Sequence, residues 1–223
     1  MVWRFLLVGL LLPEVLSSQS SQVGNWYIYF GNQAISKKWN WWNEFQFRNY
    51  NFAGDLQQLL LRTGVGYNLS EQNNNLLFGY GYIDTRNYLA GQDEKLKTEE
   101  HRLYQQFLTR QNFGRFYLQH RYRLEERFLP DNFSLRFRYF LAVNIPLNKP
   151  TLAQGAWYFS AYNEIFLQRK TPVYDRDRLY VGMGYVINKN FRAELAIMNQ
   201  MLNRDQRFQL QIVLFNTVPF LKN

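Results

Sequence analysis

The sequence predicts an all-β protein that forms a single closed antiparallel transmembrane β-barrel. The first observation is a strict alternation of apolar and polar residues, which is clearest over residues 116–145. A strand has a period of two, so each alternating row is one face of a strand. Here one row is apolar and aromatic, and the other carries Arg121, Arg123, Glu125, Arg136 and Arg138. The second observation is the length of such segments, and the third is the arginine and glycine content of their polar rows.

Composition limits the alternatives before any motif is considered. The chain has 223 residues, the size of one all-β domain, and no internal domain boundary is evident. It contains no cysteine, so disulfides and thiolate metal sites are excluded. No cluster of metal ligands and no glycine loop before a helix stands out, and we expect no cofactor and no metal.

Residues 1–20 are predicted to be a signal peptide, and 21–223 the barrel domain. Arg4 precedes a short apolar run at 5–12, and Ser18 and Ser20 fit a cleavage site. The alternative is an N-terminal helix that is retained. No later run reaches 18 apolar residues, so a transmembrane helix is not expected. A secreted chain of amphipathic strands is then either a soluble β-protein or a closed barrel in the outer membrane of a Gram-negative cell.

Five alternating segments precede residue 115, each ended by polar or turn-forming residues. They are 24–32 with Trp26, Ile28 and Phe30 in one row, 39–50 with Phe45 and Phe47, 59–68 with Leu59, Leu61 and Val65, 76–84 with Phe78, Tyr80 and Tyr82, and 99–110 with Leu103 and Phe107. The polar stretch 86–98 is predicted to be an exposed loop, and 111–114 a tight turn.

Six more segments follow, separated by breaks at 129–132, 146–150, 170–177 and 188–190. They are 116–128, 133–145, 157–168 with Trp157 and Phe159, 178–187 with Leu179 and Val181, 191–201 with Leu195 and Ile197, and 207–215 with Phe208 and Ile212. This makes eleven candidates. Because bacterial single-chain barrels have even strand counts, we expect twelve strands, with ten as the alternative.

The apolar rows are expected to face lipid and the polar rows the lumen. Most segments reach the 9–11 residues that a tilted transmembrane strand needs. Arginine, and not lysine, dominates the polar rows, and its planar fork suits crowded ion pairs. Glycines in the same rows leave room for long side chains. Trp26, Trp39, Trp41 and Trp157 near segment ends fit interfacial girdles. The expected location is therefore the cell outer membrane.

The polar rows contain the candidate lumenal cluster, which is either a binding site or a structural plug. Its members are Glu44, Arg48, Arg62, Arg102, Arg121, Arg123, Glu125, Arg127, Arg136, Arg138, Glu164, Arg178, Arg192 and Glu194. Hairpin geometry places Glu125 opposite Arg136 and Arg123 opposite Arg138, and Glu164 near Arg178. If 111–114 is the preceding turn, Arg102 faces Arg123 and Tyr104 faces Arg121. Paired arginines would rigidify the barrel, whereas excess arginine would line a narrow path for an anion, such as an acidic sugar or phosphate.

The function predicted from these rows is non-enzymatic: a structural barrel or a narrow anion-favouring conduit. The alternative is an outer-membrane enzyme that modifies lipid or lipopolysaccharide, motivated by the expected location and His120. We identify no catalytic residues, because the row neighbours of His120 include no serine. Expected partners are outer-membrane lipid and lipopolysaccharide, the barrel-assembly machinery and, for a conduit, a small anionic solute. The net charge of +9 is spread over strands, so nucleic acid is not an expected partner.

A set of short motifs resembles a family of small outer-membrane β-barrel proteins catalogued as a domain of unknown function. The motifs are Glu100-His101-Arg102 with Gln105, His120-Arg121-Tyr122-Arg123-Leu124-Glu125 with Arg127-Phe128, Arg136-Phe137-Arg138-Tyr139, Ile145-Pro146-Leu147, Ala161-Tyr162-Asn163-Glu164-Ile165-Phe166 and Arg178-Leu179-Tyr180-Val181-Gly182-Met183-Gly184-Tyr185. The resemblance covers about 22–215. It implies a barrel in the outer membrane, and it supplies no activity or catalytic residues.

Overall fold

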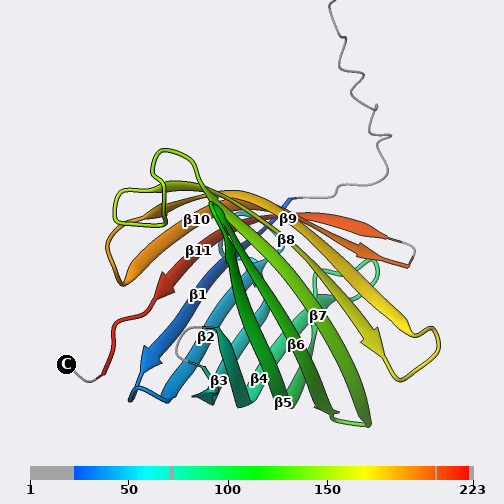
Figure 1. Cartoon of the computed structure of the whole chain (residues 1–223). Coiled ribbons are helices and arrows are strands. Elements are labelled where there is room, and N and C mark those ends of the chain that lie inside the picture. The colour runs from blue at the N-terminus through cyan, green and yellow to red at the C-terminus, as the bar shows by residue number, and fades with distance from the viewer. Residues whose placement is uncertain (1–22, 71–72, 204, 221–223) are drawn as a thin grey trace, which may run out of the picture.

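The computed structural model describes residues 23–70, 73–203 and 205–220, and these form one closed β-barrel of eleven strands (Figure 1). The predicted signal peptide, 1–20, lies outside the described residues. The strands are β1 (Gly24–Ala34), β2 (Trp39–Asn49), β3 (Leu56–Asn68), β4 (Asn74–Tyr88), β5 (Lys95–Phe113), β6 (Phe116–Leu129), β7 (Asn132–Pro146), β8 (Trp157–Gln168), β9 (Tyr174–Val186), β10 (Phe191–Leu202) and β11 (Gln206–Asn216). The expected all-β closed barrel is confirmed.

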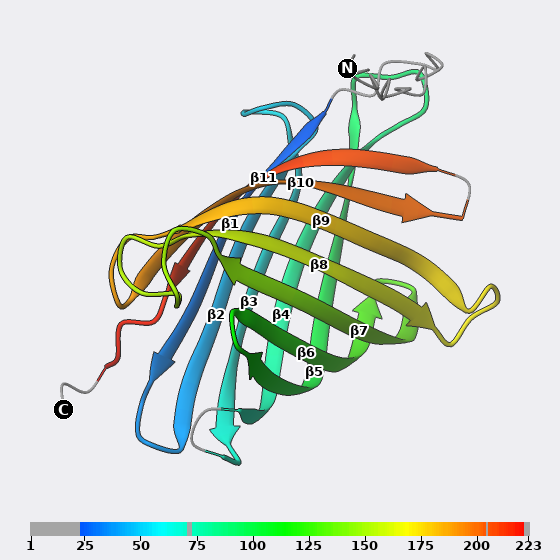
Figure 2. The ribbon, with the colours of Figure 1, turned by 45° about the horizontal axis from the view of Figure 1, so that its top comes forward.

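The eleven strands are one fewer than the roughly twelve expected and one more than the alternative of ten. Each strand pairs antiparallel with the next, and the ring closes through a parallel pair of β1 and β11, in which Trp26 is the partner of Gln211. An odd number of consecutive antiparallel strands leaves the first and last pointing the same way, so a parallel seam is the geometric consequence. The tilted view in Figure 2 shows β1 and β11 side by side at this seam.

Nine of the eleven strands are longer than the sequence pattern predicted, whereas β8 matches the prediction and β2 is one residue shorter; they have 11 to 19 residues each. The largest difference lies in the stretch 86–98, which was predicted to be a loop. There β4 continues to Tyr88 and β5 already begins at Lys95, with Arg86 paired to Lys97. Polar residues extend this hairpin because cross-strand pairing satisfies the backbone whatever the side chains are. The described part of the chain contains no helix that is long and apolar enough to cross a membrane.

The barrel has two ends, which we name by the chain terminus found there. At the N-end lie the start of β1 and the connections β2–β3, β4–β5, β6–β7, β8–β9 and β10–β11. At the C-end lie the end of β11 and the other five connections. The hairpins β8–β9 and β10–β11 project together at the N-end (Figure 2).

Polar residues are inside this barrel and apolar residues are outside. Among the described residues, 25 polar or charged side chains are buried, against 15 apolar ones. Thirty-seven large hydrophobic side chains are exposed, and they include Phe116, Leu124, Phe137 and Leu141. The arginines of the same hairpin, such as Arg123 and Arg138, are buried. The predicted orientation of the β6–β7 hairpin is therefore confirmed.

The tryptophans divide between the two faces. Trp39 and Trp157 are about half exposed on the outer wall near strand ends, and Trp41 stacks on Phe220. Trp26 was also expected on the outside, but it is buried inside the barrel at 4% exposure. It belongs to an apolar cluster on the inner faces of β1, β9, β10 and β11, formed by Trp26, Ile28, Tyr180, Ala196, Met198 and Val213. We call this cluster the apolar arc. Strand β1 thus turns its more apolar row inward, because neighbouring strands supply apolar partners there.

Glycines on the inner faces make room for tyrosines that cross them. Gly184 pairs with Tyr158 on β8 and with Glu194 on β10. The Tyr158 ring passes over Gly184, and its hydroxyl donates to Glu194 Oε1 at 2.8 Å. A Cβ on Gly184 would lie 2.1 Å from Tyr158 Cζ. Tyr104 covers Gly79 in the same way. The expectation that these glycines accommodate long lumenal side chains is confirmed.

We predict that Gly184→Ala lowers the free energy of unfolding by about 1–3 kcal/mol, because the new methyl group forces the Tyr158 ring away from Glu194. Urea unfolding in detergent micelles measures the change. The matched control is Gly81→Ala, where the nearest atom to the new Cβ is the flexible Arg62 Cγ at 3.1 Å. Equal stability for the two variants would contradict the prediction.

Candidate functional site

Eleven of the fourteen predicted cluster residues join one ion-pair network inside the barrel. We call this the central network: five carboxylates, Glu44, Glu100, Glu125, Glu164 and Asp175, and nine arginines, Arg62, Arg102, Arg121, Arg123, Arg127, Arg136, Arg138, Arg176 and Arg178. These residues come from β2, β3 and β5 to β9. The network therefore crosses the lumen instead of following one strand.

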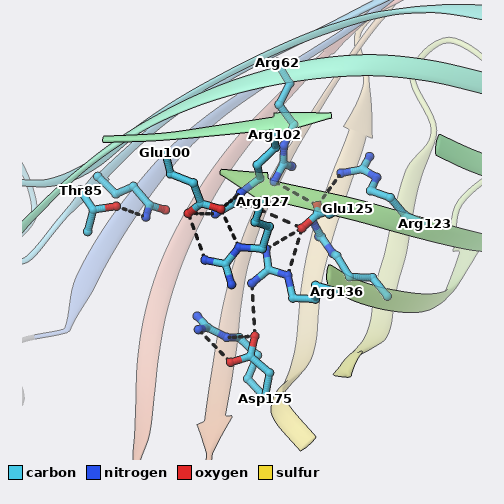
Figure 3. A network of polar contacts seen from close by, with 12 residues as sticks. Arg62, Thr85, Glu100, Arg102, Arg123, Glu125, Arg127, Arg136 and Asp175 are labelled. Atoms are coloured by element: carbon cyan, nitrogen blue, oxygen red, sulfur yellow. Dashed lines mark hydrogen bonds and ion pairs between the residues drawn. The ribbon is translucent and has the colours of Figure 1, made fainter. Parts of the chain in front are cut away.

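Glu125 is the centre of the network and has 0% exposure (Figure 3). Arg136 donates to Glu125 Oε2 through Nε at 3.0 Å and Nη2 at 2.6 Å, and Arg138 Nη1 donates to Oε1 at 2.5 Å. Three more arginines, Arg62, Arg102 and Arg123, hold a guanidinium nitrogen 3.7–3.8 Å from its carboxylate. Five guanidinium groups thus surround one carboxylate, and their charge keeps it ionised despite complete burial.

The other carboxylates link further arginines to this centre. Glu164 Oε1 accepts from Arg121 at 2.7 Å and from Arg138 at 2.6 Å. Glu100 receives two hydrogen bonds from Arg102 and two from Arg127. Glu44 accepts from Arg62 at 2.9 Å. Two-donor contacts between arginine and carboxylate fix orientation as well as distance, so these side chains are held in defined positions.

The hairpin register explains why β6 and β7 supply the core of the network. Glu125 pairs with Arg136 and Arg123 with Arg138, as predicted. Glu164 pairs with Arg178 across β8 and β9, and their charged groups lie 3.7 Å apart, which is also as predicted. Period-two alternation turns all these residues inward, and lateral pairing then places opposite charges side by side.

Two predicted contacts are wrong. Arg102 pairs with Arg127 instead of Arg123, and Tyr104 with Glu125 instead of Arg121. The β5–β6 turn consists of residues 114–115 alone, with Phe113 paired to Phe116. A four-residue turn at 111–114 was assumed. The real turn, with Gly114 at φ 57°, is centred two residues later, and this moves every β5–β6 pair by four positions.

Sequence reasoning missed Glu100, Asp175 and Arg176 as members of the network. Glu100 lies two residues before Arg102 on the same face, so the alternation itself was sufficient to find it. Asp175 and Arg176 were missed because 170–177 was predicted to be a break, whereas β9 already begins at Tyr174. A register shift lies between β8 and β9 at this point, where Leu167 pairs with Tyr174 and Phe166 with Arg176. The extra residue of this bulge turns Asp175 inward, where its Oδ2 accepts from Arg136 at 3.2 Å.

Three predicted residues are inside the barrel but outside the network. Glu194 accepts from the hydroxyls of Tyr158 and Tyr180, and not from an arginine. In the described part of the chain, no carboxylate oxygen lies within 4.0 Å of a guanidinium nitrogen of Arg48 or Arg192. The Arg48 guanidinium lies over the Trp26 ring at 3.8 Å, and that of Arg192 lies over Phe215 at 4.1 Å. These two arginines therefore carry uncompensated positive charge.

Three cavities follow one another along the lumen. The N-end cavity, of about 350 Å³, has a wall of eight arginines, among them Arg102, Arg127 and Arg136. The middle cavity, of about 130 Å³, is lined by Arg121, Phe140 and Tyr162 among others. The C-end cavity, of about 330 Å³, shares Gln119, Asn144, Arg192 and Phe215 with the middle cavity.

A septum separates the N-end and middle cavities. Its residues line both of them and are Trp26, Arg48, Arg62, Arg138 and Arg178. Arg48 and Arg178 both lie over the Trp26 ring, at 3.8 and 5.1 Å. Arg62 and Arg138 anchor the septum to Glu125. Cationic and aromatic side chains therefore narrow the lumen near its centre.

The two histidines do not take part in this site. His120 exchanges a 2.9 Å hydrogen bond with the Tyr139 hydroxyl, and His101 exchanges one of 2.5 Å with Tyr80. Within the described residues, neither imidazole hydrogen bonds to a serine, and no group of three or more potential metal ligands lies together.

We predict that Glu125→Gln lowers the free energy of unfolding by about 3–5 kcal/mol, because it removes the buried negative charge that Arg136 and Arg138 share and that three further arginines surround. Chemical unfolding in micelles measures the loss. Glu126→Gln is the matched control on the same strand, since Glu126 faces outward and accepts one hydrogen bond from Gln105. The control should change stability by less than about 0.5 kcal/mol. Similar small effects for both variants would show that the network is not needed for stability.

Comparison with known proteins assigns the chain to a family without assigning an activity. The family model described as "Protein of unknown function (DUF2490)" matches residues 23–211, which include the strands β1 to β10 and the whole central network. No curated protein and no solved structure matches significantly. The match covers most of the 223 residues, and the chain therefore belongs to the DUF2490 family of proteins of unknown function.

Proposed function

We propose that this protein is a β-barrel of the Gram-negative outer membrane whose lumen is closed at its centre by the central network and the septum. The observation that carries the proposal is the reversed distribution of side chains, with charge buried inside and large apolar groups exposed outside. In water such an outer wall would cost hydrophobic free energy over nearly the whole surface, whereas lipid is its natural solvent.

Strand length supports the same environment. Each strand has at least 11 residues, and a tilted strand needs about 9–11 to cross a bilayer. Closure supports it too, because a bilayer tolerates a sheet only when no strand edge is left unpaired. The odd strand count departs from the usual even number of bacterial barrels, but membrane barrels with odd counts exist. Such a protein would contact outer-membrane lipid and lipopolysaccharide, and the barrel-assembly machinery would insert it.

The primary role that this interior supports is structural and non-enzymatic. The central network links β2, β3 and β5 to β9 across the lumen, so it rigidifies the barrel. An enzyme that modifies lipid is the weaker candidate. It rests on His120, whose ring hydrogen bonds with Tyr139, and this pair does not supply an activated nucleophile.

A second candidate role is a gated, anion-favouring conduit. The wall of the N-end cavity contains eight arginines and one glutamate, Glu100. Five carboxylates of the central network offset part of this charge, and Arg48 has no carboxylate partner among the described residues. An acidic solute would meet a strongly cationic vestibule, and passage would require the septum to move.

The outer wall gives a direct test of membrane insertion. Ile197 lies in the middle of β10 and Val173 in the β8–β9 connection, and both are 58% exposed. We predict that Ile197→Arg destabilises the inserted barrel by about 2–4 kcal/mol and strongly reduces the amount recovered with outer membranes. Val173→Arg should leave recovery unchanged.

Cell fractionation and the heat-modifiable mobility of the barrel on gels measure these effects. If Ile197→Arg is as well tolerated as Val173→Arg, or if the wild-type protein is recovered in the soluble periplasmic fraction, the outer wall faces water and the membrane proposal fails.

The septum gives a test of the closed lumen. In planar bilayers we expect the wild-type protein to show no steady conductance. The double variant Trp26→Ala with Arg48→Ala should open a small conductance that prefers anions, because the remaining wall is cationic. The double variant Tyr50→Ala with Arg207→Ala is the control, since it also removes an arginine over an aromatic ring, at 4.9 Å, but neither residue lines the septum. Steady conductance by the wild type would contradict the closed lumen, and a cation preference in the septum variant would exclude the anion conduit.

A further inference from the structure

The middle cavity differs from the N-end cavity in having two chemically distinct sides. One side is the apolar arc, with Trp26, Ile28 and Val213, extended by Phe30 and Phe215. The other side carries Arg62, Arg121 and Arg138 from β3, β6 and β7. The wall as a whole contains six arginines and three glutamates, a formal excess of three positive charges. An apolar surface beside a cationic one matches a ligand that has both an apolar body and a negative charge.

Aromatic rings with guanidinium groups over them flank this cavity on two sides. On β7, β8 and β9, Phe140, Tyr162 and Tyr180 stack in sequence, with centroid separations of 4.8 and 4.4 Å, and the Arg121 guanidinium lies 4.4 Å from the Phe140 centroid. On β1, β2 and β11, Phe30 stacks on Phe215 and contacts Trp42, and the Arg192 guanidinium lies over Phe215. Flat faces of this kind favour a planar apolar group.

Several buried polar atoms of the wall have no hydrogen-bond partner among the described protein atoms. Five are donors: Trp26 Nε1, Trp42 Nε1, Arg62 Nε, Arg121 Nε and Gln211 Nε2. Two are acceptors: Glu44 Oε2 and Asn144 Oδ1. Gln211, Glu44 and Trp26 are at most 4% exposed. Each of these atoms is itself covered by neighbouring atoms, and the surplus of donors among them adds to the positive character that the arginines give this wall.

The volume of the middle cavity and the route into it further limit which ligands could bind there. The cavity of about 130 Å³ is close to the roughly 150 Å³ that holds a benzene ring in an engineered apolar cavity. The septum closes it toward the N-end, and the C-end cavity leads to it past Arg192 and Phe215. A ligand would therefore enter from the C-end, where Arg110 and Lys189 also line the wall, and Arg192 is the cation that the C-end and middle cavities share.

We propose that the middle cavity binds a small aromatic carboxylate, with the ring against the apolar arc and the carboxylate toward the arginine side. This inference rests on the proposed closed lumen, because the septum forms the floor of the cavity. Arg192 attracts the anion at the entrance, and guanidinium groups of the arginine side, such as that of Arg121, donate to its oxygens. The N-end cavity, which is mostly polar, has no comparable apolar side.

The test is a titration of the refolded, full-length barrel in uncharged detergent micelles with 4-fluorobenzoate, followed by ¹⁹F NMR. We expect saturable binding at least about tenfold tighter than that of 4-fluorobenzyl alcohol, which has the same ring but no charge. Inorganic phosphate, which has charge but no ring, should not displace the ligand at equal concentration.

Two variants locate the site. Arg192→Gln should weaken 4-fluorobenzoate binding about tenfold or more and leave the binding of the alcohol unchanged. Arg207→Gln is the charge-matched control, because Arg207 lines neither the middle nor the C-end cavity. Ala142→Leu fills part of the middle cavity without changing any charge, and it should weaken binding of the acid and of the alcohol alike. If that variant does not refold, the comparison of Arg192→Gln with Arg207→Gln still decides the question.

Equal affinity for acid and alcohol, full displacement by equimolar phosphate, or equal loss in Arg192→Gln and Arg207→Gln would each overturn the proposal. These results do not depend on where the barrel resides. A barrel that fractionates with membranes but does not bind 4-fluorobenzoate refutes this inference alone, whereas one that binds it but is recovered as a soluble protein refutes the membrane proposal alone.

Discussion

The interior of the barrel depends on the ion pairs that the buried Glu125 carboxylate makes with arginines. A fully buried charge is tolerated only when its lost hydration is replaced, and here guanidinium groups from β3, β5, β6 and β7 replace it. In turn, Arg136 and Arg138 carry the ion pairs onward to Asp175 and Glu164. One acidic residue thus connects opposite walls of the barrel. A barrel of eleven strands has room for a central element, and in this barrel side chains occupy that space.

The interior is charged on one side and apolar on the other, and the apolar side lies at the seam where the barrel closes. The network draws on β2, β3 and β5 to β9, whereas the strands of the parallel seam, β1 and β11, contribute Trp26, Ile28 and Val213 to the apolar arc. The two regions meet at the septum, where Arg48 and Arg178 lie over the Trp26 ring. The same contact both narrows the lumen and leaves an amphipathic cavity beside the septum. A structural interior and a binding cavity are therefore compatible in this barrel.

Much of the site could be predicted from sequence because it depends on local geometry. Alternation turned Arg123, Glu125, Arg136 and Arg138 to one side, and the short β6–β7 turn placed them opposite one another. The errors arose where local geometry departs from the simple rule. A two-residue turn at 114–115 shifted the β5–β6 register, and Asp175 lies at a bulge in a stretch that was predicted to be a break between strands. Trp26 lies inside because strands distant in sequence provide its apolar neighbours.

By itself, the sequence determined the number of alternating segments, the inward and outward rows of most of them, and the presence of glycines in the polar rows, where they leave room for long side chains. These properties follow from the period of two and from side-chain size, which are local. Only the tertiary structure decided that eleven strands close through a parallel β1–β11 seam, that Glu125 gathers five arginines, and that the lumen is divided at a septum. Those features depend on register, bulges and contacts across the lumen, and no local pattern encodes them because the residues concerned lie far apart in the chain.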